Sequence, residues 1–326
     1  MTILITGGAG YIGSHMVLAA LDAGEKVVVL DNLVTGFADA VAPGATFVTG
    51  NVSDRALTGR LIAEHGITEI LHFAASTVVP ESVADPVKYY SNNTAATLAL
   101  LAEAVAGGVQ RFIFSSTAAV YGEVDSRPVP EQHPTAPLSP YGASKLMIET
   151  MLRDIAAAHG LHYGILRYFN VAGADPQGRC GQSTRDATHL IKVACQAAIG
   201  TRPAFTIFGE DYDTPDGTCI RDFIHVSDLA DVHLQMLRHL RGGGQSETLN
   251  CGYGRGFSVR NILDAVRRAA GTDFPVVIGE RRPGDASSVI ADPARLQSVL
   301  GWRARHDDID GIVATALAWE KRLGKG

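Results

Sequence analysis

The stretch TILITGGAGYIGSHMVLAALDAGEKVVVLDN, residues 2–32, decides the fold. It has the pattern of a β-branched strand, a glycine-rich turn, a helix and a second strand, which is the order of a βαβ unit. Gly7, Gly10 and Gly13 follow one another at three-residue spacing where the helix opens. Glycine lets the backbone approach a pyrophosphate closely, and a helix N-terminus offers free N–H groups and partial positive charge. The stretch therefore predicts a Rossmann-type domain that binds a dinucleotide.

An acidic residue stands where the second strand ends. Asp31 follows Gly13 by 18 positions, a place where a carboxylate can accept hydrogen bonds from an adenosine ribose. The next residues, Asn32 and Leu33, include no arginine that could meet a 2′-phosphate. The sequence thus favours NAD over NADP as the cofactor. The alternative, that Asp31 only forms a turn at the strand end, remains open.

Strand-like and helical segments alternate through the first half of the chain. This rhythm predicts the α/β class, with a doubly wound parallel sheet and an NAD-binding Rossmann domain over residues 1–173. The strands are expected at TILIT, KVVVLD, TFVTG, EILHFAA, RFIFSS and YGILRYFN, with helices such as 14–24, 86–108 and 141–160 between them.

The rhythm breaks after Asn170, where VAGADPQGRCGQSTRD is rich in glycine, proline and polar residues, as in a loop. Residues 174–326 are expected to form a smaller α/β lobe that binds substrate, and the segment near 222–250 is expected to return to the Rossmann domain. Because ligands of doubly wound sheets bind beyond the carboxyl ends of the strands, this lobe is expected to cap that crevice. Its helices are expected at 189–200, 259–270, 292–300 and 309–323.

Composition narrows the possible partners. The 326 residues are 46% apolar and carry a formal net charge of −6 with no basic stripe, so nucleic acid is an unexpected partner. No apolar run approaches the ~20 residues that span a bilayer, and the first residues do not resemble a signal peptide, so a cytoplasmic protein without a membrane partner is expected. The four cysteines lie far apart without a CxxC pair, which favours reduced thiols and no metal site.

A second stretch, SPYGASKLMIE at residues 139–149, places Tyr141 and Lys145 on one helix face. A free phenol has a pKa of ~10, and a nearby ammonium, helped by a positive nicotinamide, favours the phenolate that a general base needs. Upstream, the strand FIFSST ends at Thr117, whose hydroxyl can bond the substrate oxygen. The three residues predict removal of hydride from a CH–OH carbon. The alternative is a polar strand end at Ser115 and Ser116, with Tyr141 as an ordinary first-turn residue.

These blocks resemble the extended short-chain dehydrogenase/reductase family nearly end to end, and in particular its UDP-glucose 4-epimerases. GxxGxxG and YxxxK mark only the superfamily, whereas DGTCIRDFIHVSDLADVH together with RRPGD is specific. The resemblance implies an isomerase that converts UDP-glucose and UDP-galactose into each other through a 4-keto intermediate, with NAD retained. Further blocks that match are PESV, YYSNN, LRYFNVAGA and LNCGYGRGFSV.

The resemblance also implies site residues. Tyr141 would be base and acid, Lys145 its electrostatic partner and ribose ligand, and Thr117 the contact to the substrate hydroxyl. NAD would be bound by Gly7, Gly10, Tyr11, Ile12, Gly13, Asp31, Asn32, Asn51, Val52, Phe73, Ala74, Ala75, Asn92, Ser115, Tyr141, Lys145 and Tyr168. The UDP-sugar would be bound by Thr117, Tyr141, Asn170, His189, Leu190, Phe208, Arg221, Arg282, Asp285 and Val289.

The chemistry of the substrate residues agrees with these roles. Arg221 and Arg282 suit diphosphate oxygens, Phe208 can flank uracil, and Asp285 can accept ribose hydroxyls. Surface ion pairing is the alternative for the arginines. Val289 stands where the family has a tyrosine or a small residue beside the sugar's C2 substituent, so UDP-N-acetylglucosamine and its 4-epimer are also expected substrates.

The chain departs from the family pattern at four positions. Asn51 stands where many relatives have aspartate, Thr77 where some have lysine, and Thr117 replaces a serine while keeping the hydroxyl. Lys192 stands where proline is common, and the sequence offers no functional account of it.

Three other functions are alternatives. A dehydratase would need an acidic pair after Thr117, where Ala118 and Ala119 stand. A 4-epimerase of another UDP-sugar, such as a pentose, remains open, as does a non-catalytic NAD-binding sensor, which would be expected to lose Tyr141 or Lys145.

The family also implies a homodimer formed by helices near 86–107 and 141–160. The apolar positions Leu98, Leu101, Ile148 and Leu152 are compatible with such an interface and equally with packing on the sheet.

Overall fold

The first two strands and the helix between them form the predicted βαβ unit. The computed structural model describes residues 1–125, 127–185, 187–282 and 285–324. In it, β1 (Thr2–Thr6) pairs in parallel with β2 (Lys26–Asp31), and α1 (Tyr11–Asp22) connects them. The β-branched residues of both strands are buried, so the sheet begins as a fully covered parallel pair.

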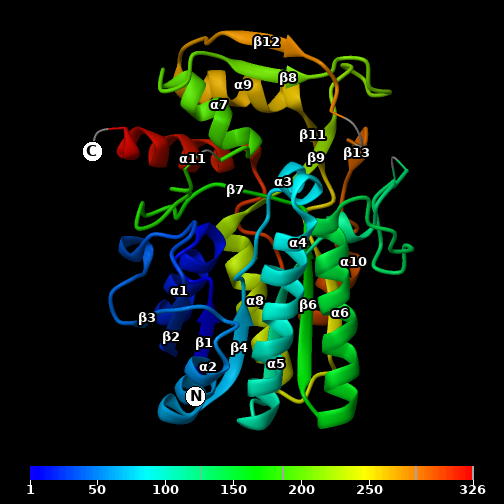
Figure 1. Ribbon diagram of the computed structural model, residues 1–326. Coiled ribbons are helices and arrows are strands. Elements are labelled where there is room, and N and C mark those ends of the chain that lie inside the picture. The colour runs from blue at the N-terminus through cyan, green and yellow to red at the C-terminus, as the bar shows by residue number, and fades with distance from the viewer. Residues whose placement is uncertain (126, 186, 283–284, 325–326) are drawn as a thin grey trace.

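Seven parallel strands make the large sheet, in the order β10-β6-β5-β4-β1-β2-β3 (Figure 1). The chain reverses its direction of growth between β1 and β4, and ligands of doubly wound sheets bind at such a switch point. The predicted α/β class with a doubly wound parallel sheet is confirmed. The other strands are β3 (Thr46–Thr49), β4 (Ile67–His72), β5 (Arg111–Thr117), β6 (His162–Tyr168) and β10 (Glu247–Cys251).

Helices cover both faces of this sheet. Ile3 and Ile5 pack with α1 and α8 (Val226–Arg241), whereas Leu4 packs on the opposite face, because successive strand residues point to opposite sides. That opposite face is covered by α2 (Arg55–His65), α5 (Ala96–Ala106) and α6 (Pro140–His159). The sheet therefore lies between two hydrophobic cores.

The segment expected as one helix over 86–108 is interrupted. It consists of α4 (Pro86–Tyr89), a π-helical turn (Tyr90–Ala95) and α5. The interruption accompanies the buried side chain of Asn93, whose amide donates to the carbonyl of Ser76 and to the hydroxyl of Ser144 on α6. Such π-turns inside helices occur frequently at functional sites.

Three of the four apolar positions considered for a dimer interface face inward. Leu101, Ile148 and Leu152 are fully buried in the core against the sheet, whereas Leu98 is 48% exposed. These three side chains therefore stabilise the protomer.

The smaller lobe lies over the carboxyl ends of the large sheet (Figure 1). Its helices α7 (Leu190–Ala198), α9 (Val259–Ala270) and α11 (Ile309–Leu323) pack together around an apolar core. Between leaving this lobe and returning to it, the chain forms α8 and β10, which belong to the large sheet and its cover. The lobe's strands are β7 (Asn170–Ala172), β9 (Ile220–His225), β11 (Gly256–Ser258) and β13 (Ser288–Val289), with a separate parallel pair of β8 (Phe205–Phe208) and β12 (Val276–Gly279).

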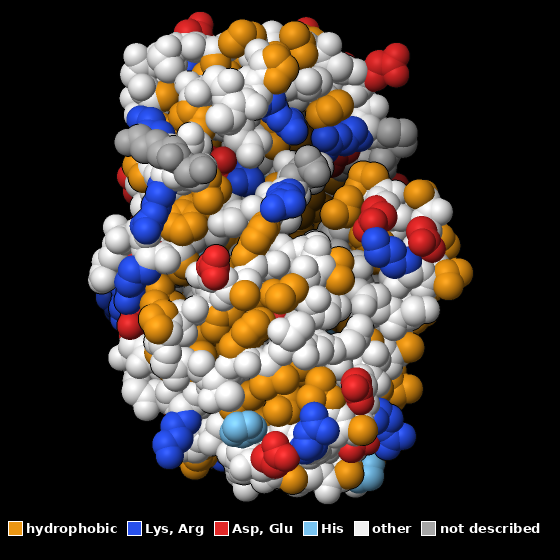
Figure 2. Space-filling model, turned by 60° about the vertical axis from the view of Figure 1, so that its left-hand side comes forward, with side chains coloured by type: hydrophobic (Ala, Val, Ile, Leu, Met, Phe, Trp, Pro, Cys, Tyr) orange, Lys and Arg blue, Asp and Glu red, His pale blue; other side chains and the backbone are white. Residues whose placement is uncertain are grey.

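Short elements complete the part of the chain that the structure describes. They are α3 (Val79–Ala84), α10 (Ala294–Leu300) and the 3₁₀ turns Ala38–Ala40 and Ala118–Val120. Within the described residues no helix is both long and apolar enough to cross a bilayer. All four cysteines are free thiols, and Figure 2 shows basic and acidic side chains interspersed over one face.

Candidate active site

One face of α6 binds to the end of β5. The hydroxyl of Ser139 caps the helix by accepting a hydrogen bond from the N–H of Gly142, so Tyr141 stands in the first turn. One turn later, Nζ of Lys145 donates to the carbonyl oxygen of Ser115 at 2.8 Å. The side chain of Thr117, at the end of β5, lies beside the Tyr141 phenol and acts to lower its pKa. The structure thus brings the three predicted catalytic residues together.

Burial is the main influence on the pKa values of Tyr141 and Lys145. It raises the pKa of Tyr141 above its ordinary value, and the neighbouring hydroxyl of Thr117 offsets this only in part. Burial also lowers the pKa of Lys145 to about 7, against which the carboxylate of Glu149 acts. The sequence predicted a lowered phenol pKa, but in this structure the direction is opposite, because desolvation of the phenol outweighs the stabilisation of its anion.

The glycine turn after β1 has a geometry that only glycine permits. Gly7 has a φ of +72°, and a Cβ there would lie 2.6 Å from the backbone nitrogen of Ala74. A Cβ on Gly13 would lie 2.1 Å from the carbonyl oxygen of Gly7. Around Gly10, by contrast, the nearest atom to an added Cβ is 3.3 Å away, and no side chain caps α1. The first N–H groups of α1, at Tyr11 and Ile12, are therefore available to a phosphate.

Asp31 ties this turn to the end of β2. Its two carboxylate oxygens accept hydrogen bonds from the N–H groups of Ala9, at 2.9 Å, and Leu33, at 2.8 Å. Leu33 adopts the left-handed conformation, with a φ of 61°, which places strain in this turn. Each oxygen keeps a further lone pair for a ribose hydroxyl. These residues fit a dinucleotide, whose pyrophosphate the glycine turn could approach and whose ribose Asp31 could bind.

The other predicted NAD residues lie at the same edge of the sheet, where the parallel strands end. Phe73, Ala74 and Ala75 follow β4, and Ser115 and Tyr168 lie near the ends of β5 and β6. Asn92, in the π-turn, donates to the hydroxyl of Ser76 at 2.9 Å. Asn32 and Asn51 are exposed and Val52 is buried in the turns after β2 and β3.

The predicted substrate residues fall into three groups. Asn170, His189 and Leu190 line one pocket together with Gln182 and Trp319. Arg282 and Asp285 line a second cleft, at the mouth of the crevice, with Glu123, Val124 and Leu138. Arg221 and Val289 are neighbours in the register of β9 with β13.

One contact joins the second and third groups, and another brings Phe208 of β8 to the second group. Arg221 forms an ion pair with Asp285, with 2.6 Å between the guanidinium nitrogen and the carboxylate oxygen. The guanidinium of Arg282 lies 3.8 Å from the centre of the Phe208 ring. The ion pair considered as an alternative for the arginines is thus present at Arg221, between two residues predicted to bind substrate. Pro283 and Gly284 of the RRPGD motif lie outside the described residues.

Residues 3–252 match the model of the NAD dependent epimerase/dehydratase family. The chain belongs to this family. It is 54% identical to a UDP-glucose 4-epimerase of Azospirillum brasilense, over 98% of this chain and 92% of that protein. A crystal structure of UDP-glucose 4-epimerase from Brucella ovis in complex with NAD matches with a TM-score of 0.94 and 42% identity, over 97% of both chains. The UDP-Glc/GlcNAc 4-epimerase of Campylobacter jejuni matches with a TM-score of 0.86 and 45% identity, over 98% of this chain and 99% of that one.

The predicted resemblance, NAD as the cofactor and an enzyme of the epimerase class are confirmed by these matches. Within this epimerase-family chain, sequence reasoning missed the polar residues that support the site. Glu149 is buried behind the reactive pair, and Asn93 holds the π-turn against α6. A signal for Glu149 was present, since it follows Lys145 by one helical turn on the same face of the helix.

Proposed function

We propose that this protein interconverts UDP-glucose and UDP-galactose by inverting the configuration at C4 of the sugar. The observation that carries the proposal is the grouping of Tyr141 with Thr117 and the buried Lys145, whose Nζ is held by the carbonyl of Ser115, at the sheet edge where the glycine turn lies. This arrangement occurs in a chain whose full-length relatives are named UDP-glucose 4-epimerases.

In the proposed reaction, the Thr117 hydroxyl and the Tyr141 phenol hold the sugar 4′-hydroxyl between them. Tyr141, as phenolate, takes its proton, and as phenol returns a proton after the sugar has turned. NAD, when bound, supplies the chemistry of accepting hydride from C4 and giving it back. Lys145 contributes a positive charge that favours the phenolate.

The second step needs an anchored nucleotide and a sugar that can rotate. In this proposal Arg221 and Arg282 hold the diphosphate, and Asp285 and Phe208, which contact them, bind the uridine. Binding energy is then concentrated on the part of the substrate that does not react. The 4-keto sugar turns about its diphosphate link and presents its other face to the same phenol.

We also propose that UDP-N-acetylglucosamine and UDP-N-acetylgalactosamine are substrates. Val289 is partly exposed and lies opposite Arg221 in the pairing of β13 with β9. Its side chain is smaller than the tyrosine found in some relatives and leaves room for a 2-acetamido group. The similarity to a UDP-Glc/GlcNAc 4-epimerase supports this choice. In Val289→Tyr, turnover of the acetamido sugars should fall by at least about tenfold while UDP-galactose turnover is kept.

The test is to incubate the purified protein with UDP-galactose without added NAD and to look for UDP-glucose. Conversion would support both the epimerase and a retained cofactor. Failure even with added NAD, and with UDP-pentoses and UDP-N-acetylhexosamines in parallel, would leave the non-catalytic sensor as the better description.

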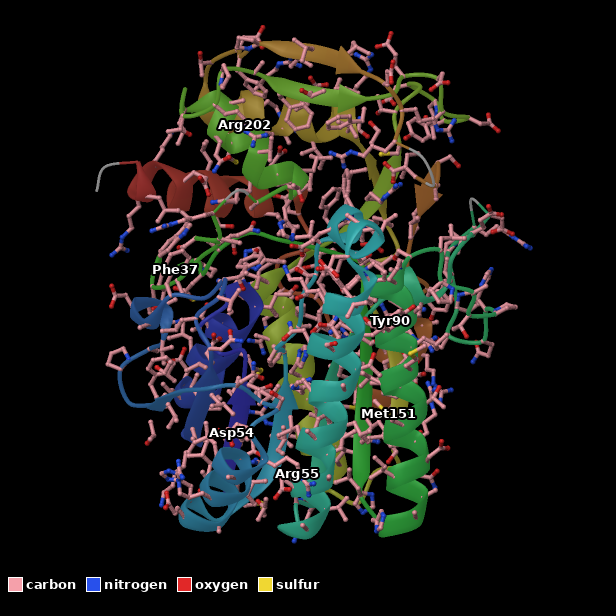
Figure 3. The ribbon with its side chains drawn as sticks, in the orientation of Figure 1. Phe37, Asp54, Arg55, Tyr90, Met151 and Arg202 are labelled. Carbon is pink, nitrogen blue, oxygen red and sulfur yellow. The ribbon has the colours of Figure 1, made fainter. Side chains whose placement is uncertain are left out.

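We further propose a homodimer through the outer surfaces of the π-turn, α5 and α6. Tyr90, Leu98 and Met147 are 36%, 48% and 46% exposed on these helices. Figure 3 labels Tyr90 and Met151 on the neighbouring helices of this surface. Leu98→Glu should shift the mass in light scattering from dimer to monomer, whereas a monomeric wild-type protein would refute the proposal.

A further inference from the structure

A carboxylate lies buried on the same face of α6 as the reactive pair. Glu149 follows Lys145 by one turn and Tyr141 by two, and it is 0% exposed. Two arginines pair with it. Arg167 on β6 donates to both of its oxygens, at 2.8 and 2.5 Å, and Arg153 donates to one at 2.9 Å.

Three consecutive residues of β5 each lie against one member of this face. The carbonyl of Ser115 accepts from Lys145, and the hydroxyl of Ser116 donates to Glu149 at 2.6 Å. The next residue along, Thr117, lies beside the phenol of Tyr141. Ser116 is therefore flanked on both sides by strand residues that hold the reactive pair. A shift of Glu149 along the strand would change the register of all three contacts.

Glu149 also acts on Lys145 through its charge. Lys145 is 2% exposed, and the acceptor of its ammonium is a neutral carbonyl, so burial favours loss of its proton. The carboxylate of Glu149 opposes that loss, since its charge raises the pKa of Lys145.

The other titratable groups packed around the ammonium are neutral near pH 7. His72 on β4 has its pKa lowered to about 3 by burial and by the charge of Lys145. Burial raises the phenol pKa values of Tyr141, Tyr168 on β6 and Tyr89 on α4. Among the groups described around Lys145, Glu149 is thus the anion that supports its charge, while Arg153 and Arg167 face Glu149 itself.

We propose that Glu149 is a positioning residue of the reaction: through Ser116 it keeps α6 in register with the end of β5, and through its charge it keeps Lys145 a cation. The proposal rests on the proposed function for its effect on turnover. Its effect on Lys145 does not depend on which sugar is epimerised.

Two substitutions in the NAD-bound protein separate charge from position. Glu149→Gln keeps the shape but removes the charge, so the high-pH limb of kcat and the titration of the Lys145 side chain, followed by NMR of its ¹³Cε and ¹⁵Nζ, should both move down by about one pH unit. Ser116→Ala keeps the charge, so the titration should stay in place while kcat falls by about tenfold with little change in KM.

Further variants guard against a folding defect. Glu149→Gln leaves Arg167 unpaired in the interior, a change that can prevent folding. The double variant Glu149→Gln with Arg167→Gln removes both charges and should show the same downward shift of the Lys145 titration. Arg153→Gln, which removes a half-exposed cation from the same carboxylate, serves as the matched control and should not lower that titration.

The outcomes separate the role of Glu149 from the proposed function. A Lys145 titration unchanged in Glu149→Gln and in the double variant would overturn the proposal, whatever the activity. A downward shift together with wild-type protein that turns over no UDP-sugar would support the role of Glu149 and refute the proposed function.

Discussion

Lys192 and Glu320 form a buried ion pair that joins α7 to α11. Each residue is only 5% exposed, and Nζ of Lys192 also donates to the carbonyl of Gln182 at 2.7 Å. Lys192 therefore connects three segments: the loop before α7, α7 itself and the C-terminal helix α11. This connection lies beside the pocket lined by Asn170 and His189. This contact accounts for a lysine at a position where the sequence alone offered no explanation.

Breaking this pair should destabilise the protein more than removing it. Glu320→Gln leaves the Lys192 ammonium uncompensated in the interior and should lower the free energy of unfolding by about 3 kcal/mol. The control is Lys192→Met with Glu320→Leu, which leaves no buried charge and should cost less. Urea unfolding of both variants is the measurement, and equal losses would contradict a buried, uncompensated charge.

Removal of the phenol should abolish turnover without abolishing binding. Tyr141→Phe lacks the group that moves the proton, so kcat should fall by at least about 100-fold, with KM for the UDP-sugar little changed. Initial rates with saturating UDP-galactose provide the test. More than a tenth of wild-type turnover would show that another group is the base.

The hydroxyl of Thr117 should matter, and its methyl group should not. Thr117→Val removes the hydroxyl beside Tyr141 and should lower kcat by about tenfold or more, because that hydroxyl lowers the pKa of Tyr141 and so favours the phenolate. Thr117→Ser keeps the hydroxyl and should retain most of the activity. If the valine and serine variants had similar rates, the hydroxyl would have no part in the chemistry.

Acid should destabilise the fold through buried histidines. Burial lowers the pKa of His72 to about 3 and that of His233 to about 4, from an unfolded value of 6.5. Between pH 6.5 and these values the unfolded chain binds protons that the folded chain does not. The contribution of each neutral histidine to the free energy of unfolding is therefore fully present above pH 6.5 and is lost as the pH falls below it. Each histidine should cost about 2 kcal/mol at pH 5 relative to pH 7.

His233→Leu tests this origin directly. Its Nε2 has no hydrogen-bond partner within the described residues, so replacement by leucine removes no hydrogen bond at that atom. The loss of unfolding free energy between pH 7 and pH 5, measured in urea, should be smaller than in the wild type by about 2 kcal/mol. His162→Gln, at an exposed position, is the matched control and should retain the full loss.

Much of the fold followed from local pattern. The glycine turn, the strand before it and the acidic residue after β2 lie within one βαβ unit, and Tyr141 and Lys145 share a helix face by their spacing alone. Such features depend on neighbours in the chain, so the Rossmann domain and the reactive pair were accessible from sequence.

Contacts between distant segments decided the rest. The π-turn depends on Asn93 reaching Ser76 and Ser144, and the inward direction of Leu101 depends on where the sheet lies. The rise in the Tyr141 pKa, opposite to the expected direction, follows from burial by segments remote in the chain. The sequence by itself determined which chemical groups are present and how near neighbours are arranged, whereas only the tertiary structure decided their desolvation and partners, because both depend on residues that folding brings together.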